Sequence, residues 1–261
     1  MSNSLQFWQS VQGVAQRVWW ELLHRKRSLL FWLVFPLVVL LLNGIIFADR
    51  AELELSEALQ FAAPASLVGA AFFFSCLGGS VAIIVAEREQ NTLKRLLITP
   101  LSGGAYFAGI YLALGGIALL QTLAVLILVY LLGAPYQGNW GLGLAILVLS
   151  VAAYVGAGFI LGTQLARRTE DVNALVATLG LPLMILGGAF FPSSIFPKSL
   201  LAIARYNPVY HMTEALTQVW AEGKDWPTIQ GHLQFLAIFT VFMILGGWLA
   251  YQRVLAQERR R

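Results

Sequence analysis

Charge-free stretches constrain this chain more than any other feature of its sequence. Five of them lack Asp, Glu, Lys and Arg altogether, at residues 28–48, 58–86, 96–166, 172–197 and 226–252. A helix needs about 20 apolar residues to cross the hydrocarbon core of a bilayer, and every stretch is long enough for one. Charged residues make up 11% of the chain and hydrophobic residues 58%, whereas soluble domains carry about 25% charged residues. The pattern therefore predicts a membrane protein.

The longest stretch is too long for a single helix. Residues 133–141 (GAPYQGNWG) interrupt it with Gly, Pro and Asn, which are typical of turns. We therefore expect an all-α membrane protein with six transmembrane helices, in a domain at residues 29–252. The expected spans lie at residues 29–47, 64–86, 105–132, 142–165, 173–190 and 233–251. In the fourth span, Gly158 and Gly162 permit close helix packing, either within the bundle or between two copies.

The basic residues predict the orientation. Thirteen of the 17 lie at the chain ends or in the loops after the second and fourth spans, and four lie on the opposite side. The thirteen are Arg17, Arg25, Lys26, Arg27, Arg88, Lys94, Arg95, Arg167, Arg168, Arg253, Arg259, Arg260 and Arg261. By the positive-inside rule both termini, including the basic tail 253–261, are expected in the cytoplasm. The membrane we expect is a plasma membrane of the bacterial inner-membrane type. The charges do not cluster with stacking aromatics, so they give no support to nucleic-acid binding.

An amphipathic segment precedes the first span, within residues 1–28. Apolar residues recur at helical spacing over 5–23, and the basic residues 25–27 follow. Such a helix either lies in the inner membrane interface or packs on protein. We expect the interface, because the segment continues directly into a span.

A polar segment at residues 87–100 (EREQNTLKRLLITP) follows the second span. In it, Leu93, Leu96 and Leu97 share one helical face, Asn91 or Thr92 caps the start, and Pro100 ends the helix. The residues alone fit two interpretations equally well. The helix is either a docking surface with apolar anchors and a polar rim, or a solvated loop whose leucines return to the membrane surface.

The segment 191–222 after the fifth span is too apolar for an ordinary loop and too short to span. Pro197 suits the first turn of one short helix, and Asn207-Pro208 reads as an N-cap and first-turn proline for another. We expect two short helices that enter the outer leaflet and are shielded there by protein. An acidic outer loop is expected at residues 49–57.

The sequence lacks the residues that ATP hydrolysis, metal binding and proton transfer require. No Gly-Lys-Ser/Thr occurs, so the chain has no P-loop for ATP hydrolysis and is not expected to be an enzyme by itself. The three histidines, His24, His211 and His232, form no metal-ligand motif. The core spans carry no ionisable acid or base for a proton relay. Their polar residues include Asn43, Gln121, Thr122 and Tyr154, which are candidates for a substrate path, although such groups more often bond neighbouring helices.

Two motifs resemble a known family. Residues 87–101 resemble the pattern after the second span of ABC-2 type permeases, with Asn91 where the family usually has Gly. Residues 190–216, from Phe190-Phe191-Pro192 through Tyr206-Asn-Pro-Val-Tyr210 to Glu214-Ala-Leu216, are similar to that family's pattern between the fifth and sixth spans. The order of the motifs in a six-span chain extends the resemblance over essentially the whole sequence.

The resemblance implies the membrane subunit of an ATP-driven exporter, paired with a second permease copy or a related permease and with two ABC ATPase subunits. ATP and magnesium would bind to those partners, and this chain would hold no cofactor or metal. Two sets of site residues follow from the match. The ATPase-coupling residues would be Glu87, Arg88, Glu89, Asn91, Thr92, Leu93, Leu96, Leu97 and Pro100. The outer gate would be Phe191, Pro192, Pro197, Asn207, Pro208 and Tyr210.

Two other classes of function remain open from the sequence. One is a membrane scaffold or assembly factor that transports nothing. The other is an intramembrane enzyme, which the absence of a catalytic motif disfavours. The weakly polar spans suit a lipid, a hydrophobic drug or a lipid-linked glycan equally, so the residues leave the substrate open.

Overall fold

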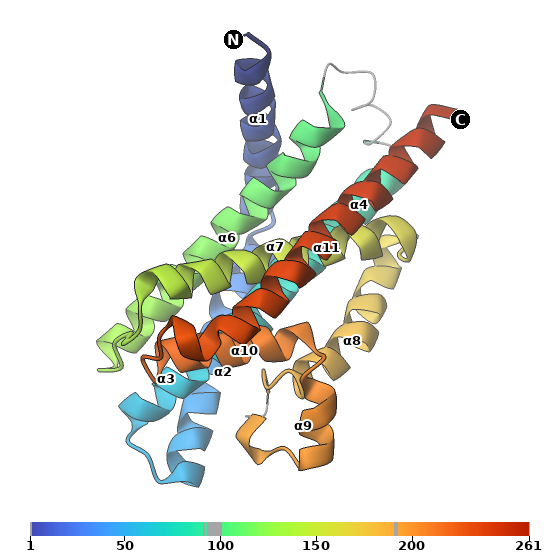
Figure 1. Ribbon diagram of the computed structural model, residues 1–261. Coiled ribbons are helices and arrows are strands. Elements are labelled where there is room, and N and C mark those ends of the chain that lie inside the picture. The colour runs from blue at the N-terminus through green and yellow to red at the C-terminus, as the bar shows by residue number, and fades with distance from the viewer. Residues whose placement is uncertain (1, 91, 93–100, 191–192, 261) are drawn as a thin grey trace.

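A computed structural model describes residues 2–90, 92, 101–190 and 193–260 (Figure 1). In that part of the chain the regular structure is helical, and six helices are long and apolar enough to cross a membrane. These are α2 (Lys26–Ala51), the continuous helix Leu55–Glu89, α6 (Gly103–Leu131), α7 (Trp140–Gln164), α8 (Thr169–Leu186) and α11 (Trp226–Arg260). The predicted six-span all-α membrane fold is confirmed.

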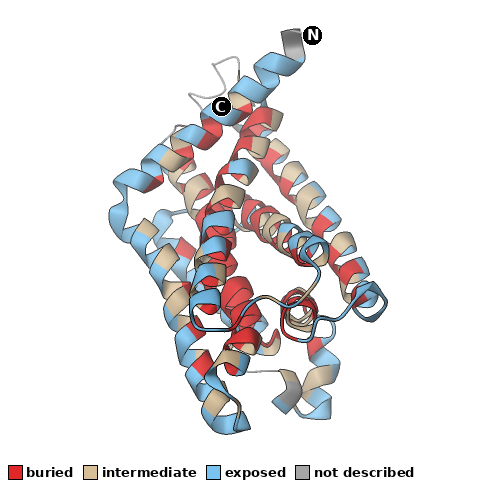
Figure 2. Cartoon of the chain, turned by 90° about the vertical axis from the view of Figure 1, so that its left-hand side faces the viewer, coloured by how far each residue is buried: buried red, intermediate tan, exposed pale blue. Residues whose placement is uncertain are grey.

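The continuous helix Leu55–Glu89, here called the second span, has three parts. These are α3 (Leu55–Ala65), a segment of wider π-helical turns (Ser66–Gly78) and α4 (Gly79–Glu89). This helix is the centre of the bundle, because 78% of its most apolar stretch is buried, against 17% for α2. Figure 2 shows the buried residues gathered along the middle of the molecule. Small side chains such as Ala62, Ala63 and Ala71 let the surrounding helices approach it closely.

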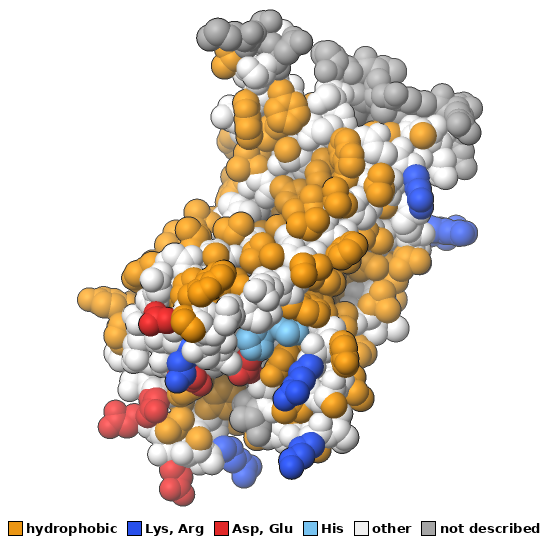
Figure 3. Space-filling view, viewed as in Figure 1, with side chains coloured by type: hydrophobic (Ala, Val, Ile, Leu, Met, Phe, Trp, Pro, Cys, Tyr) orange, Lys and Arg blue, Asp and Glu red, His pale blue; other side chains and the backbone are white. Residues whose placement is uncertain are grey.

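The remaining elements lie at the two ends of the bundle. Both chain termini lie at one end, where α4 also finishes; we call this the terminal end (Figure 1). The opposite end, here called the far end, holds α3, α9 (Lys198–Ala204) and α10 (Pro208–Trp220) (Figure 1). Figure 3 shows that charged side chains gather at the far end and near the terminal end, with a largely apolar surface between them. That distribution suits a protein surrounded by hydrocarbon at its middle.

The second span begins earlier than its sequence indicates. The expected acidic loop 49–57 is mostly helical, because α2 continues to Ala51 and α3 starts at Leu55. Glu57 lies in the first turn of α3, where a carboxylate interacts favourably with the helix dipole. The reversal between the helices occurs at Glu52, whose φ of 55° is left-handed. Pro64, the expected start of the span, lies buried inside the helix just before its wider turns begin.

The fifth span is also displaced toward the N-terminus. The helix covers Thr169–Leu186 in place of the expected 173–190. The carboxylate of Asp171 accepts hydrogen bonds from the backbone N–H groups of Arg167 at 3.3 Å and Arg168 at 3.0 Å, which stabilises an earlier start. The chain then turns at Gly188, whose φ of +77° favours glycine.

The first helix, α1 (Ser2–His24), packs on protein. Its Val11, Val14 and Val18 are buried, and a Cβ atom at Gly109 of α6 would lie 2.6 Å from the Cβ of Val14. The surface that α6 covers is only part of the apolar surface of α1, because Leu5, Trp8 and Trp20 are exposed, and the expected position in the membrane interface stays a prediction. The amphipathic pattern cannot distinguish a lipid surface from a protein surface, since both bury the same residues.

The close glycine spacing in α7 is used inside the chain. A Cβ atom at Gly158 would lie 1.7 Å from the Oγ of Ser80 and 2.8 Å from the carbonyl oxygen of Leu77. A Cβ at Gly162 would lie 3.2 Å from the Cα of Val81. The two glycines therefore allow α7 to pack against the second span, which answers the question that the sequence left open.

Candidate functional site at the end of the second span

Three consecutive charged residues end α4, and each is bonded to a different part of the bundle. Glu87, Arg88 and Glu89 belong to the set that the sequence assigns to ATPase coupling. Of the other members, Asn91, Leu93, Leu96, Leu97 and Pro100 lie outside the described residues, and Thr92 is half-buried. The described part of the predicted coupling segment is therefore its connection to the transmembrane helices.

Glu87 is buried, with 7% of its surface exposed, and it bonds to two helices. Its carboxylate forms an ion pair with the guanidinium of Arg17 on α1 and accepts a hydrogen bond from the hydroxyl of Tyr106 on α6. The ring of Tyr106 stacks on Tyr251 of α11, with centroids 5.2 Å apart. A buried carboxylate requires such partners, because an unpaired charge away from water is very costly.

Arg17 is held in place by two carboxylates. Besides Glu87, it lies 3.6 Å from the carboxylate of Glu21, one turn later on α1. Burial by itself lowers the pKa of the Arg17 guanidinium, but the charge of Glu87, assisted by Tyr106 and Glu21, raises it overall. Arg17 therefore remains charged at physiological pH. The sequence does not reveal this pair, because the two residues are 70 positions apart and α1 is expected elsewhere.

Arg88 caps the end of α7. Its Nη1 donates hydrogen bonds to the carbonyl oxygens of Gly162 at 3.1 Å, Thr163 at 3.2 Å and Ala166 at 3.2 Å. The last carbonyls of a helix lack partners within the helix and carry partial negative charge, so a guanidinium is well matched to them. Arg88 thereby fixes the end of the second span to the end of the fourth.

Glu89 reaches the next helix. Its carboxylate accepts a hydrogen bond from the hydroxyl of Thr169, the first residue of α8. Taken together, one helical turn bonds to α1, α6, α7 and α8. A displacement of the chain after Glu89 would therefore act on four helices at once, which is a mechanical role and needs no reacting group.

The predicted outer-gate residues cap and position the helices of the far end. The side chain of Asn207 caps α10 by accepting from the N–H of Val209 at 3.0 Å, and its Nδ2 donates to the carbonyl oxygen of Leu183 on α8 at 2.6 Å. Pro208 is the first residue of α10, and Pro197 immediately precedes α9. Phe191 and Pro192 lie outside the described residues.

A histidine pair, which sequence reasoning missed, joins α10 to α11. The Nδ1 atoms of His211 and His232 are 2.9 Å apart, and the Nε2 of His211 lies 2.8 Å from the carbonyl oxygen of Arg205. Because a carbonyl only accepts, the Nε2 of His211 is the donor and its Nδ1 accepts from His232. The pKa of His211 is lowered by burial, which its hydrogen bond to Arg205 partly opposes. Tyr210 flanks the pair, 5.5 Å from the ring of His211. The described residues contain no group of three or more potential metal ligands.

The four candidates for a substrate path share no hydrogen bond among the described contacts. Gln121 is buried, accepts from Ser75 at 2.8 Å and donates to the carbonyl of Trp32 at 2.8 Å. Tyr154 donates to the sulfur of Met184 at 3.9 Å, and Thr122 to the carbonyl of Ala118, on its own helix, at 2.8 Å. The Nδ2 of Asn43 on α2 is buried and has no hydrogen-bond partner among the described residues. Gln121 and Tyr154 thus bond neighbouring helices, which is the more common use of such residues in membranes.

The sequence is similar to known transport proteins. A profile of the ABC-2 type transporter family matches residues 9–220. The inner membrane transport permease YadH of Escherichia coli (strain K12) is 24% identical over 243 residues, which cover 90% of this chain and 93% of that protein. The probable multidrug ABC transporter permease YbhR of the same organism is 25% identical over 158 residues, covering 60% of this chain and 43% of YbhR. The family match covers most of the chain and includes both motifs, so this protein belongs to the ABC-2 type transporter family.

Proposed function

We propose that this chain is the membrane subunit of an ATP-driven exporter in an inner membrane, with both termini in the cytoplasm. A second permease copy or a related permease completes the path, and two separate ABC ATPase subunits bind ATP and magnesium. Family membership supports the transport role, and relatives named as inner membrane transport permeases support the location. The missing P-loop supports a separate source of energy.

The bonds at the end of α4 carry this proposal. An ATPase that moves residues 90–100 would pull on Glu87, Arg88 and Glu89, and through them on the ends of four helices. Packed helices respond to such a force by moving as rigid bodies, because their interiors resist continuous deformation. The coupling segment would in this way convert ATP-driven closure of the partner into rearrangement of the spans.

A cavity at the far end supports an exit path there. It has a volume of about 400 Å³ and is lined by residues of α2, α3, α10 and the turn after α8. Glu214 of α10 lines it and accepts hydrogen bonds from Ser193 at 2.8 Å and Gln218 at 3.1 Å. Gly187 and Gly188 line this cavity and directly follow the last residue of α8. A movement of α8 at the terminal end would therefore reach the cavity.

The first test asks whether the chain associates with an ABC ATPase. The tagged chain is purified from its native membrane in mild detergent, and the copurified proteins are identified by mass spectrometry. An ABC ATPase in equimolar amount, with ATP hydrolysis that requires magnesium, is the expected result. A chain that associates with no ATPase in native membranes would contradict the proposal and favour a scaffold.

The second test addresses coupling. Arg88→Ala removes the cap on α7, an interaction worth about 1–2 kcal/mol, so we expect the ATPase to remain bound while ATP turnover of the complex falls roughly tenfold. Arg253→Ala is the matched control, because Arg253 is an exposed arginine near the same end. Equal turnover in Arg88→Ala and wild type would show that the bonds of α4 do not transmit the motion.

Replacing Leu93, Leu96 and Leu97 with Asp should abolish ATPase binding.

A further inference from the structure

The histidine pair joins two helices of the far end and has no role in the proposed coupling. His211 lies in the first turn of α10, and His232 lies near the start of α11. Both side chains are half-buried. Figure 3 shows histidine atoms at the surface of this region, next to acidic and basic side chains. Protons therefore reach the pair from solution.

The geometry of the pair accommodates one added proton but not two. The Nε2 of His211 donates to the carbonyl oxygen of Arg205, so its Nδ1 accepts from the Nδ1–H of His232, 2.9 Å away. A first added proton binds at the Nε2 of His232, and the bond between the two Nδ1 atoms then has a charged donor. A second added proton must occupy the Nδ1 of His211. Two N–H groups then face each other without a lone pair between them, and the bond is lost.

The groups next to the pair come from α10, α11 and the residue after α9. Glu214 of α10 lies close enough to interact electrostatically with His232. Tyr210 flanks both rings, with centroids 5.5 Å from His211 and 5.9 Å from His232. Burial lowers the pKa of His211, and the hydrogen bond to the carbonyl of Arg205 opposes this in part.

The other helices packed against α10 and α11 carry few charges near this contact. The middle of the second span, Ser66–Gly78, and α7 contain no charged residue, and α11 contains none before Arg253. The acids of α8 lie in its first turn, toward the terminal end. Glu57 of α3 is exposed to solvent. The two imidazoles are therefore the titrating groups of the contact.

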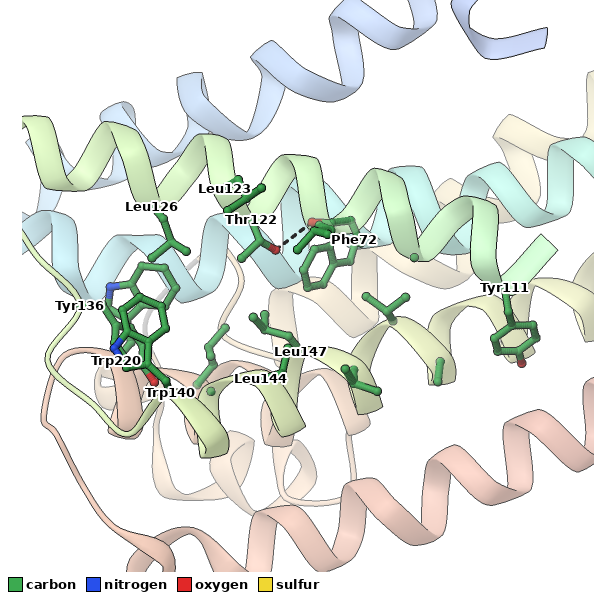
Figure 4. Close-up of a pocket in the computed structure, with 18 residues that line it drawn as sticks. Phe72, Tyr111, Thr122, Leu123, Leu126, Tyr136, Trp140, Leu144, Leu147 and Trp220 are labelled. Carbon is green, nitrogen blue, oxygen red and sulfur yellow. Dashed lines mark hydrogen bonds between the residues drawn. The ribbon is translucent and has the colours of Figure 1, made fainter. Parts of the chain in front are cut away.

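The first turn of α10 lies between the fifth and sixth spans. On one side, the Nδ2 of Asn207 bonds the carbonyl of Leu183 at the end of α8. On the other side, the histidine pair is the described hydrogen bond to α11. The opposite end of α10 is anchored by Trp220, which is 1% exposed and lies 5.1 Å from the ring of Tyr136 (Figure 4). Loss of the histidine bond therefore acts at the first turn of α10.

The ring of His211 is not free to turn away from a second charge. It is held by the hydrogen bond to Arg205 and is stacked on Phe235, with centroids 3.9 Å apart and planes 13° apart. Two imidazolium rings with facing N–H groups repel each other strongly at this distance. The repulsion therefore displaces His232, together with the start of α11.

We propose that the histidine pair is a proton-controlled latch between the first turn of α10 and the start of α11. The latch is closed with no added proton or one, and the second added proton opens it. Opening separates α11 from the turn that carries Asn207, Pro208 and Tyr210 of the predicted outer gate. That the latch responds to the pH outside the cell rests on the proposed function, whereas the latch itself is a property of this chain alone.

The pH dependence of the latch follows from proton counting. Two separated histidines each titrate near about 6.5, whereas the closed pair holds at most one added proton. Acid therefore favours the open state, and the latch stays closed above about pH 7. The ratio of open to closed chains rises roughly tenfold per pH unit for each proton by which the open state exceeds the closed one.

Nitrogen NMR observes the bond directly. The full chain, labelled with ¹⁵N-histidine and purified in detergent micelles, contains three labelled rings. A ¹⁵N–¹⁵N coupling through the hydrogen bond should connect the Nδ1 nuclei of His211 and His232 at pH 8. It should disappear in acid as both rings become imidazolium. A spectrum without this coupling at pH 8 would overturn the proposal.

Opening is measured as a distance between spin labels. Tyr206, just before α10, and Gln234 on α11 are both exposed, and Cys76→Ala removes the native thiol. Labels on Tyr206→Cys and Gln234→Cys should move apart as the pH falls. The ratio of separated to closed chains should rise by more than about tenfold between pH 6 and pH 5. A bond that is lost at an unchanged distance would show that other contacts hold the helices together, and would contradict the latch.

A non-titrating variant provides the matched comparison. His232→Asn keeps an N–H donor at about the position of the Nδ1 and binds no proton. One proton then opens the latch, so the ratio should rise by less than about tenfold between pH 6 and pH 5. His24→Gln, an exposed histidine of α1, should behave as the wild type. An equal response of all three chains would indicate general acid unfolding and overturn the proposal.

The experiments use the chain without partners. The latch can therefore fail while an ABC ATPase copurifies with the chain, and it can hold where none does. The two outcomes separate this proposal from that of the transport function.

Discussion

At the scale of single residues, polar side chains within the spans complete the backbone hydrogen bonding of neighbouring helices. Pro36 lies inside α2 and has no N–H, so the carbonyl of Trp32 has no partner in its own helix. Gln121 of α6 donates to that carbonyl at 2.8 Å and accepts from Ser75 at 2.8 Å. One glutamine thus allows a proline in the first span and connects three spans.

Gln121→Leu should destabilise the protein, because it leaves the buried carbonyl of Trp32 unpaired and the hydroxyl of Ser75 with only the weak contact to the sulfur of Cys76 at 3.6 Å. We expect a loss of about 1–3 kcal/mol. Thr122→Val is the matched control, since among the described residues the Thr122 hydroxyl bonds to Ala118 of its own helix alone, and it should cost less than about 1 kcal/mol. Thermal unfolding followed with a thiol-reactive dye measures both, because the single cysteine, Cys76, is buried until the bundle opens. Equal effects of the two substitutions would contradict this role.

His211 should make stability depend on pH. Its pKa is lowered in the folded protein, whereas an unfolded histidine titrates near about 6.5. The unfolded state therefore binds more protons than the folded state once the pH falls below about 6.5. The contribution of His211 to stability is constant above about pH 6.5 and decreases between that pH and the lowered pKa of the folded protein. The unfolding temperature measured at a series of pH values should show this slope. His211→Gln, which keeps a donor for the carbonyl of Arg205, should flatten the part due to His211, and an unchanged slope would rule out this group as its source.

At the scale of elements, small residues set how closely the helices approach. Gly156 of α7 packs against α11, where a Cβ atom would lie 2.6 Å from the backbone of Met243. Gly158 packs against the second span, where a Cβ atom would lie 1.7 Å from the Oγ of Ser80. The hydrophobic effect does not drive helices together inside a bilayer, so close van der Waals contact is the main source of stability. The fourth span owes its close approach to both neighbours to these contacts.

Gly158→Leu should therefore separate α7 from the second span. Overpacking of a close contact costs about 1–3 kcal/mol, and here the obstructing atoms include the backbone carbonyl of Leu77, which cannot rotate away. Gly115→Leu serves as the control, since α6 has free space at that position. A lower unfolding temperature for Gly158→Leu alone is the expected result. If both variants melted alike, the contact would contribute nothing specific.

At the scale of the whole molecule, the ion pair of Arg17 and Glu87 holds α1 to the bundle. Arg17→Met leaves the buried carboxylate of Glu87 without its counter-charge. Removing one partner of a buried pair costs about 3–5 kcal/mol, and the 29% exposure of the Arg17 side chain places the expected loss toward the lower end. Glu87→Gln in the same chain should restore part of the stability, because no buried charge is then left unpaired; Glu21, the other partner of Arg17, is exposed to solvent.

A double-mutant cycle of these two substitutions measures the pair directly. The unfolding free energies of the wild type, the two single variants and the double variant give the coupling energy. Additive effects would show that the two side chains do not interact in the membrane. Raised salt should change the coupling little, since a buried pair is only weakly screened.

The sequence by itself determined the class of this protein and the number of its spans. Charge-free stretches indicate six spans because an uninterrupted apolar helix has no other stable environment. The residues 133–141 and Asn207-Pro208 also predict their local structures, because turns and caps depend on neighbours in the chain: Asn139 caps α7 and Asn207 caps α10. The motifs at 87–101 and 190–216 indicate the family for the same reason, since each is a continuous segment.

Only the tertiary structure decided which polar groups meet. The pair of Arg17 and Glu87, the cap of Arg88 on α7 and the histidine pair join residues far apart in the chain, and no spacing in the sequence encodes them. The same holds for α1, since only the packed bundle shows that α6 covers Val11, Val14 and Val18. Helix periodicity specifies which face is apolar, whereas the neighbour of that face depends on the packing of the whole bundle.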